Sequence, residues 1–501
     1  MHPNHFSTSL NPLVRHLNKE PENFTKEDII RFIENKGIKM LNFRYAGGDG
    51  RLKSLNFVIN DSTYLDRILT HGERIDGSSL FAFVETGSSD LYVIPKFRTA
   101  FVDPFTELPT LCILCSYYTR DGKPLEIAPE YILKKAAESF KEVTGMDFQV
   151  MGELEYYVIG EQEANFQATD QKGYHESGPF AKFEDFRMEA MYRIACAGGK
   201  VKYGHSEVGN FTLDQKIYEQ NEIEFLVTDI ESAANQIIVA KWIIRKLAYQ
   251  YGLDVTFAPK IATGKAGSGM HIHTCIMKDG HNCMVTGGCL NDIAKSAIAG
   301  YMHCAPSLTA FGNKNPASYF RLVPHQEAPT TVCWGDSNRS VLVRVPLGWT
   351  TNNDMVANEN PLEPPIEMDR SQKQTIEFRC PDGSADIYLL LAGLTVAARY
   401  GFEMDDAMEV AQKTYVNVNI FHEEHKNKAA SLNSLPVSCW ESAGMLDRQR
   451  AIYERYGVFP AHIIDGIIKD LKKFDDKDIR MQLEKNPDQM MEIVRRFFYC
   501  G

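Results

Sequence analysis

The sequence predicts an α+β protein of two domains, and three observations lead to this prediction. The chain has 501 residues, which is more than one hydrophobic core usually supports. Up to about residue 126 it reads as short strands and two helices, whereas strands alternate with long helices beyond that point. No internal repeat stands out, which argues against a solenoid. We therefore expect a small domain over residues 1–127 and a larger domain over residues 128–501.

Local signals predict the elements of the small domain. Thr25 followed by Asp28 is typical of a capping box and predicts a helix through about Asn35. The turn residues Gly-Gly-Asp-Gly at 47–50 separate two strand-like runs and predict a hairpin. The expected elements are hairpin strands at 39–46 and 51–59, a helix near 61–71, and strands at 90–96 and 110–118.

The larger domain is predicted to contain long helices between strands, followed by about a hundred mostly helical residues. The expected helices cover roughly residues 130–143, 183–197, 229–250, 291–304 and 385–413.

Composition excludes several classes of function. The formal net charge is −12, so a general nucleic-acid binder or a basic membrane-surface protein is not expected. No apolar run reaches the roughly 20 residues needed to span a bilayer, and the N-terminus lacks the pattern of a secretory signal. Eleven cysteines, an odd number in a long chain, fit reduced thiols in the cytoplasm better than a disulfide framework.

Four strand-like segments of the larger domain place two polar residues around one apolar residue. Successive strand side chains point to opposite faces, so each polar pair is expected to share one face. Any one such strand is typical of an exposed sheet, but these four offer five carboxylates and two histidines against one arginine. The pairs are Glu153 and Glu155, Glu222 and Glu224, His271 and His273, and Glu377 and Arg379.

If these side chains converge, the pattern indicates a metal site. Bare carboxylates that meet would repel one another and take up protons, unless a cation resolves the repulsion. Carboxylates with an occasional imidazole suit Mg²⁺ or Mn²⁺, whereas zinc usually takes more His and Cys. The number of carboxylates favours two or more ions, and several such ions beside arginines indicate phosphoryl chemistry.

Arginines lie close to these segments in the sequence. Arg321 and Glu327 belong to one loop-like segment, Arg339 and Arg344 to another, and Arg379 shares a strand with Glu377. The planar guanidinium bonds two oxygens at once, so Arg is a preferred clamp for carboxylate and phosphate. Neither a P-loop nor a Rossmann spacing is present. The segments together favour an anionic substrate beside metal and nucleotide.

Six segments resemble the glutamine synthetase family, closest to the bacterial and archaeal type I form. They follow the order of the family, and the resemblance covers about residues 40–415. The segments are IDGSSL at 75–80, GELEYYV at 152–158, APKIATGKAGSGMHIH at 258–273, NPASYFRLVPHQEAP at 315–329, NRSVLVR at 338–344 and EFRCPDGSAD at 377–386.

The resemblance implies a fold, an assembly and a set of metal ligands. The implied fold is a β-grasp-like N-terminal domain with a catalytic domain built on a curved antiparallel sheet flanked by helices. The implied assembly is two hexameric rings, with each active site completed by the neighbouring subunit's N-terminal domain. One metal would be held by Glu153, His271 and Glu377, and the other by Glu155, Glu207 and Glu222.

The implied reaction is ATP-dependent amide formation from glutamate and ammonium through a γ-glutamyl phosphate. Arg339 and Arg344 would offset charge on the transferred phosphoryl group, and His273 would lie against the nucleotide. Asp76 of the neighbouring subunit would take a proton from ammonium, and Glu327 would close over the acyl phosphate. The ammonium pocket would comprise Asp76, Ser79, Tyr174, Glu207 and Glu327, and Gly267, Arg321 and Arg379 would bind the amino acid.

Two departures from the family pattern leave alternatives open. Ala266 stands where the family usually has Asn, and about seven extra residues separate Glu207 from Glu222. Glu219 or Glu224 could therefore take the role given to Glu222. A γ-glutamyl-amine ligase of the same fold is the nearest rival function, and a non-catalytic structural relative is the alternative from another class.

Overall fold

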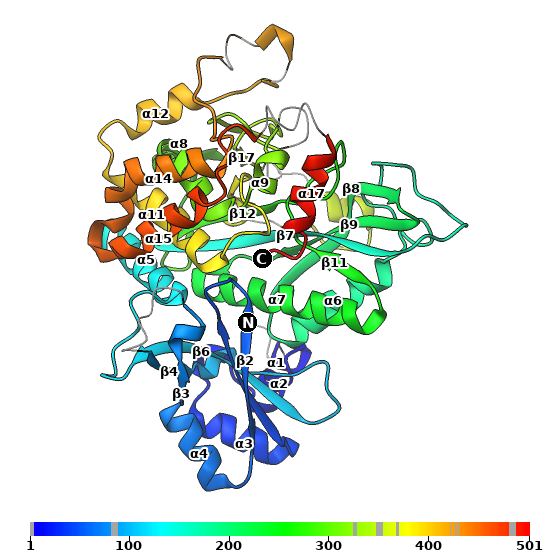
Figure 1. The fold of residues 1–501 in the computed structure, drawn as a ribbon, viewed down its shortest axis with the longest axis vertical. Coiled ribbons are helices and arrows are strands. Elements are labelled where there is room, and N and C mark those ends of the chain that lie inside the picture. Colours follow the sequence, from blue (N-terminus) through cyan, green and yellow to red (C-terminus); the bar gives the residue numbers. More distant parts are fainter. Residues whose placement is uncertain are drawn as a thin grey trace.

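The structure is a computed structural model that describes residues 5–81, 89–323, 328–346, 354–366, 370–420, 422–425, 427, 430–479 and 487–501. Two sheets organise it, one in the N-terminal part and one in the larger part that follows. Figure 1 shows the N-terminal sheet and its helices below the larger part, with helix α7 (Ile230–Tyr251) between the two sheets.

Six strands form the N-terminal sheet. Their order is β2-β1-β6-β4-β3, with β5 paired to β6. The pair β1 and β6 is parallel, and the other pairs are antiparallel. The strands are β1 (Met40–Ala46), β2 (Leu52–Val58), β3 (Glu73–Asp76), β4 (Asp90–Pro95), β5 (Phe101–Val102) and β6 (Thr110–Thr119).

The capping box predicted at the first long helix is confirmed. The Thr25 hydroxyl accepts a hydrogen bond from the Asp28 amide at 3.3 Å, and the Asp28 carboxylate accepts one from the Thr25 amide at 3.1 Å. This helix ends at Gly37, whose φ of 63° suits glycine. The helices of this part are α1 (His5–Thr8), α2 (Pro12–Leu17), α3 (Lys26–Lys36) and α4 (Ser62–His71).

The larger sheet carries the four predicted polar pairs on adjacent strands. Its order is β16-β17-β18-β12-β7-β9-β8, with β10 and β11 paired to β7 and β13 paired to β12. Only β16 and β17 pair in parallel among the described strands of this sheet. The strands are β7 (Asp147–Glu161), β8 (Val201–Leu213), β9 (Lys216–Phe225), β10 (Thr228–Asp229), β11 (Asp254–Thr256), β12 (Met270–Lys278), β13 (His281–Asn282), β16 (Trp334–Asp336), β17 (Val343–Val345) and β18 (Ile376–Phe378), and β14 (Val285–Thr286) pairs separately with β15 (Cys289–Leu290).

Helices cover the apolar face of this sheet, as the alternation predicted. Leu154, Ile223, Ile272 and Phe378, the apolar members of the four segments, are all buried in the main core cluster. Helix α7 packs so closely on β7 that a Cβ at Gly152 would lie 2.6 Å from Ile237. The other helices are α5 (Pro129–Thr144), α6 (Glu184–Cys196), α8 (Asp292–Gly312), α9 (Pro316–Arg321), α10 (Met355–Glu359), α14 (Cys439–Glu454), α15 (Ala461–Lys472) and α17 (Pro487–Arg496). The predicted α+β class with a helix-flanked antiparallel sheet is confirmed.

The single helix expected over residues 385–413 is wrong. The structure has α11 (Ile387–Glu403) and α12 (Ala407–Thr414), which are bent by 115° relative to each other. Met404 adopts an extended conformation, with φ −82° and ψ 128°, and ends α11. Among the described residues no single helix is long and apolar enough to cross a membrane, and this bent pair meets that length and composition only when its two members are joined.

The extra residues between Glu207 and Glu222 lengthen a hairpin. Strands β8 and β9 pair from Asn210 opposite Glu219 to Leu213 opposite Lys216. Asp214 and Gln215 form the two-residue turn with φ of 51° and 62°, which is typical of a type I′ hairpin. The ladder is irregular between Ser206 and Asn210, and Glu207 lies in this irregular part.

Candidate active site

The register of the larger sheet brings the polar pairs into rows. On β12, His271 lies opposite Glu153 of β7, and His273 lies opposite Glu377 of β18. On β9, Glu222 lies opposite Glu155 and Glu224 opposite Glu153. Because a one-residue slip would turn every side chain to the other face, this register decides which groups meet.

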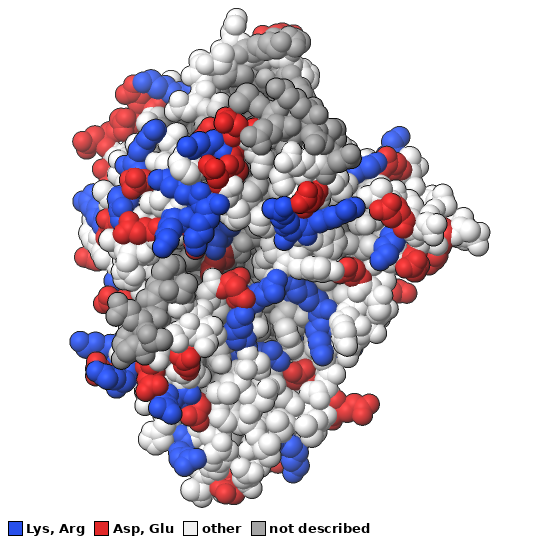
Figure 2. All heavy atoms as spheres, viewed as in Figure 1, with Lys and Arg blue, Asp and Glu red and all other residues white. Residues whose placement is uncertain are grey.

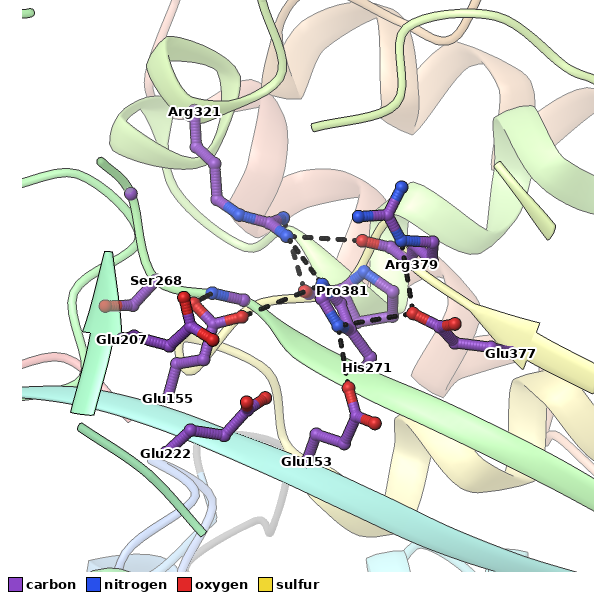
Figure 3. A network of polar contacts seen from close by, with 12 residues as sticks. Glu153, Glu155, Glu207, Glu222, Ser268, His271, Arg321, Glu377, Arg379 and Pro381 are labelled. Carbon is purple, nitrogen blue, oxygen red and sulfur yellow. Dashed lines mark hydrogen bonds and ion pairs between the residues drawn. The ribbon is translucent and has the colours of Figure 1, made fainter. Parts of the chain in front are cut away.

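His271 lies at the centre of the resulting cluster (Figure 3). Its Nδ1 is 2.9 Å from a Glu153 carboxylate oxygen and 3.5 Å from a Glu377 oxygen. Its Nε2 is 3.8 Å from Glu155. The three ligands predicted for one metal, Glu153, His271 and Glu377, are therefore brought together.

Glu155 is positioned by hydrogen bonds from both sides. Its carboxylate accepts a hydrogen bond from the Gly269 amide at 2.8 Å and one from the Gln220 side chain at 2.9 Å. A Cβ at position 269 would lie 2.5 Å from Arg321 and 2.8 Å from His271. Glycine at this position therefore allows the backbone to approach the cluster.

Glu207 and Glu222 reach the same pocket from β8 and β9. His205 lies between them, with its Nε2 3.2 Å from Glu222 and its Nδ1 3.7 Å from Glu207. In Figure 3 the carboxylate of Glu222 lies below those of Glu155 and Glu207, and all three residues line the pocket.

The alternatives for Glu222 differ in their surroundings. Glu219 is fully buried, and its carboxylate accepts hydrogen bonds from the amides of Lys182 and Phe183 at 2.6 and 3.2 Å. It is not among the residues that line the pocket, whereas Glu222 and Glu224 are. Glu224 accepts a hydrogen bond from Lys202 at 2.7 Å and another from the Tyr203 hydroxyl. Glu222 has no such lysine partner among the described residues.

Burial and neighbouring charges shift the pKa values of Glu222 and Glu153 in opposite directions. Burial and then the charges of Glu153, Glu155, Glu207 and Glu224 raise the pKa of Glu222 well above its usual value. Burial also opposes ionisation of Glu153, but His273 and His271 hold the pKa of this carboxyl well below its usual value. Burial lowers the pKa of His205. His205 is therefore less able than a free imidazole to offset the charge of Glu222.

Arginines close the opposite side of the pocket. Arg379 Nε and Arg344 each donate to one oxygen of Glu377, both at 3.1 Å. Arg321 donates to the carbonyl of Cys380 at 2.8 Å and approaches His271 Nε2 to 3.5 Å. Arg339 is exposed, and its carbonyl accepts a hydrogen bond from Arg379.

Together these residues line a pocket of about 570 Å³. Among the described residues, three sets of side chains could each hold a metal ion, because the ligand atoms within each set lie within 4.8 Å of one another. The sets are Glu153 with His273 and Glu377, Glu153 with Glu222 and His271, and His205 with Glu222 and Glu224. His273, predicted to lie against the nucleotide, has its Nε2 2.8 Å from Glu153 and does not line the pocket. Tyr174 and Gly267 do line it.

Two further predicted residues, Asp76 and Ser79, are not brought to this pocket. The exposed Asp76 is near the end of the N-terminal sheet, where it accepts hydrogen bonds from the hydroxyls of Ser78 and Ser79 at 2.7 and 2.9 Å. These bonds, first of all that of Ser78, lower the pKa of Asp76. Neither Asp76 nor Ser79 lines the pocket of its own chain, and Glu327 lies outside the described residues.

Sequence reasoning missed several groups that the structure places in the site. Gln220 is two residues before Glu222, so strand alternation alone could have placed it on the same face. His175 has a φ of 58°, and the centre of its ring lies 4.2 Å from that of Tyr174, on which it stacks. No sequence pattern predicts this contact. Thr375, which contacts His273 Nδ1 at 2.8 Å, was also missed.

The side chain of Gln171 lies beside Ala266, where the family usually has Asn. The Ala266 amide donates to the Gln171 side chain at 2.8 Å, and the Ala266 carbonyl accepts from the Tyr157 hydroxyl at 2.9 Å. Gln171, Ala266 and Gly267 all line the pocket. A side-chain amide is therefore present beside Ala266, contributed by Gln171.

Two family descriptions match almost the whole chain. "Glutamine synthetase, catalytic domain" matches residues 126–490, and "Glutamine synthetase, beta-Grasp domain" matches residues 37–120. The β-grasp character expected of the N-terminal sheet is thereby confirmed.

Curated relatives and solved structures give the same result. The glutamine synthetase of Clostridium saccharobutylicum is 30% identical over 84% of this chain and 89% of its own length. That of Methanococcus maripaludis is 29% identical over 88% of this chain and 94% of its own length. A Plasmodium falciparum glutamine synthetase structure has a TM-score of 0.74 at 18% identity, covering 91% of this chain and 97% of its own. A GmaS/ADP complex has a TM-score of 0.73 at 18% identity, covering 92% and 99%. The chain belongs to the glutamine synthetase family.

Proposed function

We propose that this protein is a glutamate–ammonia ligase that forms glutamine, ADP and phosphate through a γ-glutamyl phosphate. The observation that carries the proposal is the arrangement around His271, where carboxylates from four strands face arginines across one pocket. Such a pocket suits a reaction in which a carboxylate and a phosphoryl group, both negatively charged, must be held together.

The donor set fits hard divalent cations. Burial and then the neighbouring carboxylates raise the pKa of Glu222, so a bound cation would stabilise its charged form. We propose that Glu153, His271 and Glu377 hold one Mg²⁺ or Mn²⁺ and that Glu155, Glu207 and Glu222 hold another. Bound there, these ions would neutralise the phosphate oxygens of ATP.

The protein's own groups would orient the two anionic substrates. Arg344 and Arg339 would contact the transferred phosphoryl group, with Arg344 held by Glu377. Arg321 and Arg379 would bind the carboxylates of glutamate, and Gly267 would let its backbone approach them. We propose that His273 lies behind Glu153 and orients this carboxylate rather than contacting the nucleotide directly.

Ammonium would be bound at the end of the pocket formed by Tyr174 and Glu207. Asp76 and Ser79 of a neighbouring subunit, with Glu327, would complete this end. The hydrogen bonds from Ser78 and Ser79 keep Asp76 ionised, so it can accept a proton from ammonium. Tyr174 is 48% exposed in the single chain, which leaves room for a neighbouring subunit to cover it.

A γ-glutamyl-amine ligase is the second candidate, favoured by the changed surroundings of Ala266. Gln171 provides an amide there, but its oxygen already accepts the Ala266 amide hydrogen, so its contact with an amino acid differs from that of an asparagine. Retention of Asp76, Tyr174 and Glu327 favours ammonium, because a bulky amine would need this small anionic pocket to be reshaped.

Phosphate release tests the proposal. The full chain with glutamate, ATP and Mg²⁺ or Mn²⁺ is expected to release phosphate when ammonium is added. Glu155→Gln should lower kcat/KM at least about 100-fold. The matched control is Glu161→Gln, an exposed carboxylate at the end of the same strand, which should leave the rate unchanged.

The other outcomes point to the alternatives. Activity with an alkylamine but not with ammonium would transfer the proposal to the γ-glutamyl-amine ligase. Absence of phosphate release with every amine would overturn both ligase proposals and favour the non-catalytic relative.

We also propose a domain division between residues 127 and 128, an oligomer of two hexameric rings, and a cytoplasmic location. The separate core of the N-terminal sheet and the start of α5 at Pro129 support the division. All eleven cysteines are free thiols, which supports a reducing compartment. The ring assembly rests on the family.

A further inference from the structure

A second pocket, of about 500 Å³, lies between the N-terminal sheet and helix α7 and is separate from the active site. Four cationic side chains line it: Arg51 from the turn between β1 and β2, and Lys241, Arg245 and Lys246 from α7. The aromatic residues Trp242, Tyr249 and Tyr499 complete its wall. Figure 2 shows basic side chains gathered around a hollow at the place where Figure 1 shows α7 and the C-terminal end.

The two central cations, of which Lys241 is buried and Arg245 partly buried, are held by backbone carbonyls. Lys241 and Arg245 are one helical turn apart and share a face of α7. Lys241, which is 4% exposed, donates to the Gly383 carbonyl at 2.7 Å. Arg245 donates to the Cys500 carbonyl at 3.0 Å, and Arg51 donates to the Tyr499 carbonyl. These contacts fix the positions of the cations without neutralising them.

No carboxylate of the described chain forms an ion pair with any of the four cations within 4.0 Å. Asp49, the acidic group of the same turn, is paired with Lys53 at 2.6 Å. Burial, and then the charge of Arg245, lowers the pKa of Lys241 to about 8. Burial and the charge of Arg51 lower the pKa of Arg245 to about 10. The charges of Asp382 and Asp386 near Lys241, and of Asp49 near Arg245, offset this effect only in part. A partly buried cluster of cations is destabilising, and a bound anion would reduce this cost.

We propose that this pocket binds a small anion with at least two negative charges, carried by phosphate or carboxylate groups. Arg51 and Arg245 can each bond two oxygens of one such group, and Lys241 and Lys246 add single donors. The hydroxyl of Tyr249 offers a further donor at the rim of the pocket. The limited volume of the pocket and the net charge of −12 on the chain suit a small anion rather than a nucleic acid.

The anion would join three segments that are distant in sequence. These are the β1–β2 turn, helix α7 and residues 497–501, whose carbonyls the pocket cations already contact. Lys241, another cation of the pocket, donates to the carbonyl of Gly383, which is four residues after Arg379 of the active site. An anion in the pocket is therefore expected to stabilise the docked position of residues 497–501 and the loop that follows β18.

Binding of inorganic pyrophosphate and phosphate to the full chain tests the proposal. In a metal-free buffer, titration calorimetry should detect a site that binds pyrophosphate more tightly than phosphate, and pyrophosphate should raise the Tm. Arg51→Met, at an exposed position, should weaken this binding at least about tenfold. Lys241→Met should weaken it similarly, because one cation of the pocket is removed.

Arg344→Met is the matched control, since it removes a cation from the active-site pocket instead. It should leave the pyrophosphate site intact. Loss of binding in Arg344→Met together with normal binding in Arg51→Met and Lys241→Met would assign the anion to the active site and overturn the proposal. Absence of binding at millimolar pyrophosphate would overturn it as well. Tricarboxylates tested in the same way would show whether carboxylate or phosphate groups are preferred.

Discussion

At the scale of single residues, Glu222 shows most clearly why the active-site pocket favours cations. It lies opposite Glu155 on the neighbouring strand, and Glu153, Glu207 and Glu224 are close enough to raise its pKa. Burial acts in the same direction, so an ionised Glu222 is destabilising in the metal-free protein. A divalent cation reverses this effect because its charge is greater than that of any neighbouring side chain.

Replacing Glu222 by Gln should therefore have opposite effects on metal affinity and on stability. We expect Mn²⁺ affinity to fall at least about tenfold, because a charged ligand becomes neutral. The metal-free protein should unfold at equal or higher urea concentration, since the crowded carboxylate is gone. Mn²⁺ titration followed by electron paramagnetic resonance and urea unfolding would measure the two effects.

Glu219→Gln is the matched control on the same strand. Its carboxylate accepts hydrogen bonds from two backbone amides outside the pocket, so this variant should lose about 1–3 kcal/mol of stability while Mn²⁺ affinity stays unchanged. If Glu219→Gln weakened Mn²⁺ binding and Glu222→Gln did not, the ligand role would belong to Glu219.

How far the site could be predicted depends on whether strand alternation carries the information. It placed Glu153, Glu155, Glu222, Glu224, His271 and Glu377 on one face, and the structure brings them into one pocket. Alternation could not distinguish Glu222 from Glu224, because both share that face and differ only in cross-strand neighbours. Gln171 and His175 could not be predicted either, because they lie in an irregular segment with left-handed backbone.

At the scale of elements, the lengthened β8–β9 hairpin extends the edge of the sheet away from the metal ligands. The ladder beyond the irregular part pairs Phe211 with Tyr218, whose rings stack at 4.7 Å. Phe211 also packs in a small core cluster with Tyr157. The added residues therefore pack against Tyr157, whose hydroxyl donates to the carbonyl of the pocket residue Ala266. The turn itself contributes no proposed metal ligand.

Shortening this hairpin at its tip should leave the site intact. Replacement of residues 213–216 by Asn-Gly keeps Thr212 opposite Ile217 and provides a turn sequence that favours type I′. We expect Mn²⁺ affinity to stay within about twofold of the original and the Tm to change by no more than about 3 °C. Calorimetry on both proteins would show this, and a large loss of Mn²⁺ affinity would mean that the hairpin tip positions Glu222.

The break between α11 and α12 illustrates what periodicity cannot predict. Apolar residues continue at helical spacing from residue 385 to residue 413, so the sequence pattern favours one helix. In the structure the break falls between Glu403 and Ala407, and α12 then packs on α8 through Ala407 and Ala411. Tertiary packing, which the pattern does not contain, decides where the chain turns.

At the scale of the whole molecule, the two parts meet at groups whose ionisation depends on burial. Glu130, at the start of α5, accepts a hydrogen bond from the Tyr117 amide of β6 at 3.0 Å. Burial, moderated by Lys96, raises the pKa of Glu130 to about 7. Nearby, Glu231 of α7 is paired with Lys96 at 2.8 Å and with Arg98, both from the N-terminal part.

Glu130 should make stability fall as pH rises. Its folded pKa of about 7 exceeds the unfolded value of about 4.3, so the folded state binds the extra proton between these values. The stabilisation is fully present below about pH 4 and is lost as pH rises through 7, by up to about 3 kcal/mol. Glu130→Gln should therefore gain stability relative to the original protein at pH 8 but not at pH 4.5. Urea unfolding at the two pH values measures this, with the exposed Glu138→Gln on α5 as control.

Because Asp76 does not line the pocket of its own chain, mixed oligomers of two variants can test whether neighbouring subunits share active sites. Asp76→Asn alone should lower kcat about 100-fold or more, because the proposed proton acceptor is lost. Glu377→Gln alone should also be inactive, because a metal ligand is lost. If each active site combines one chain's Asp76 with another chain's Glu377, mixed oligomers of the two variants contain some sites with both residues intact.

Random mixing of equal amounts should restore about one quarter of the original activity, since half of the subunits supply each intact half-site. The two variants would be unfolded and refolded together, and phosphate release compared with that of each variant refolded alone. Native mass spectrometry would confirm that mixed oligomers form. Activity that stays at the level of the single variants in verified mixed oligomers would show that Asp76 acts within its own chain or not at all. The shared-site arrangement would then be wrong, even if the metal cluster around His271 were correct.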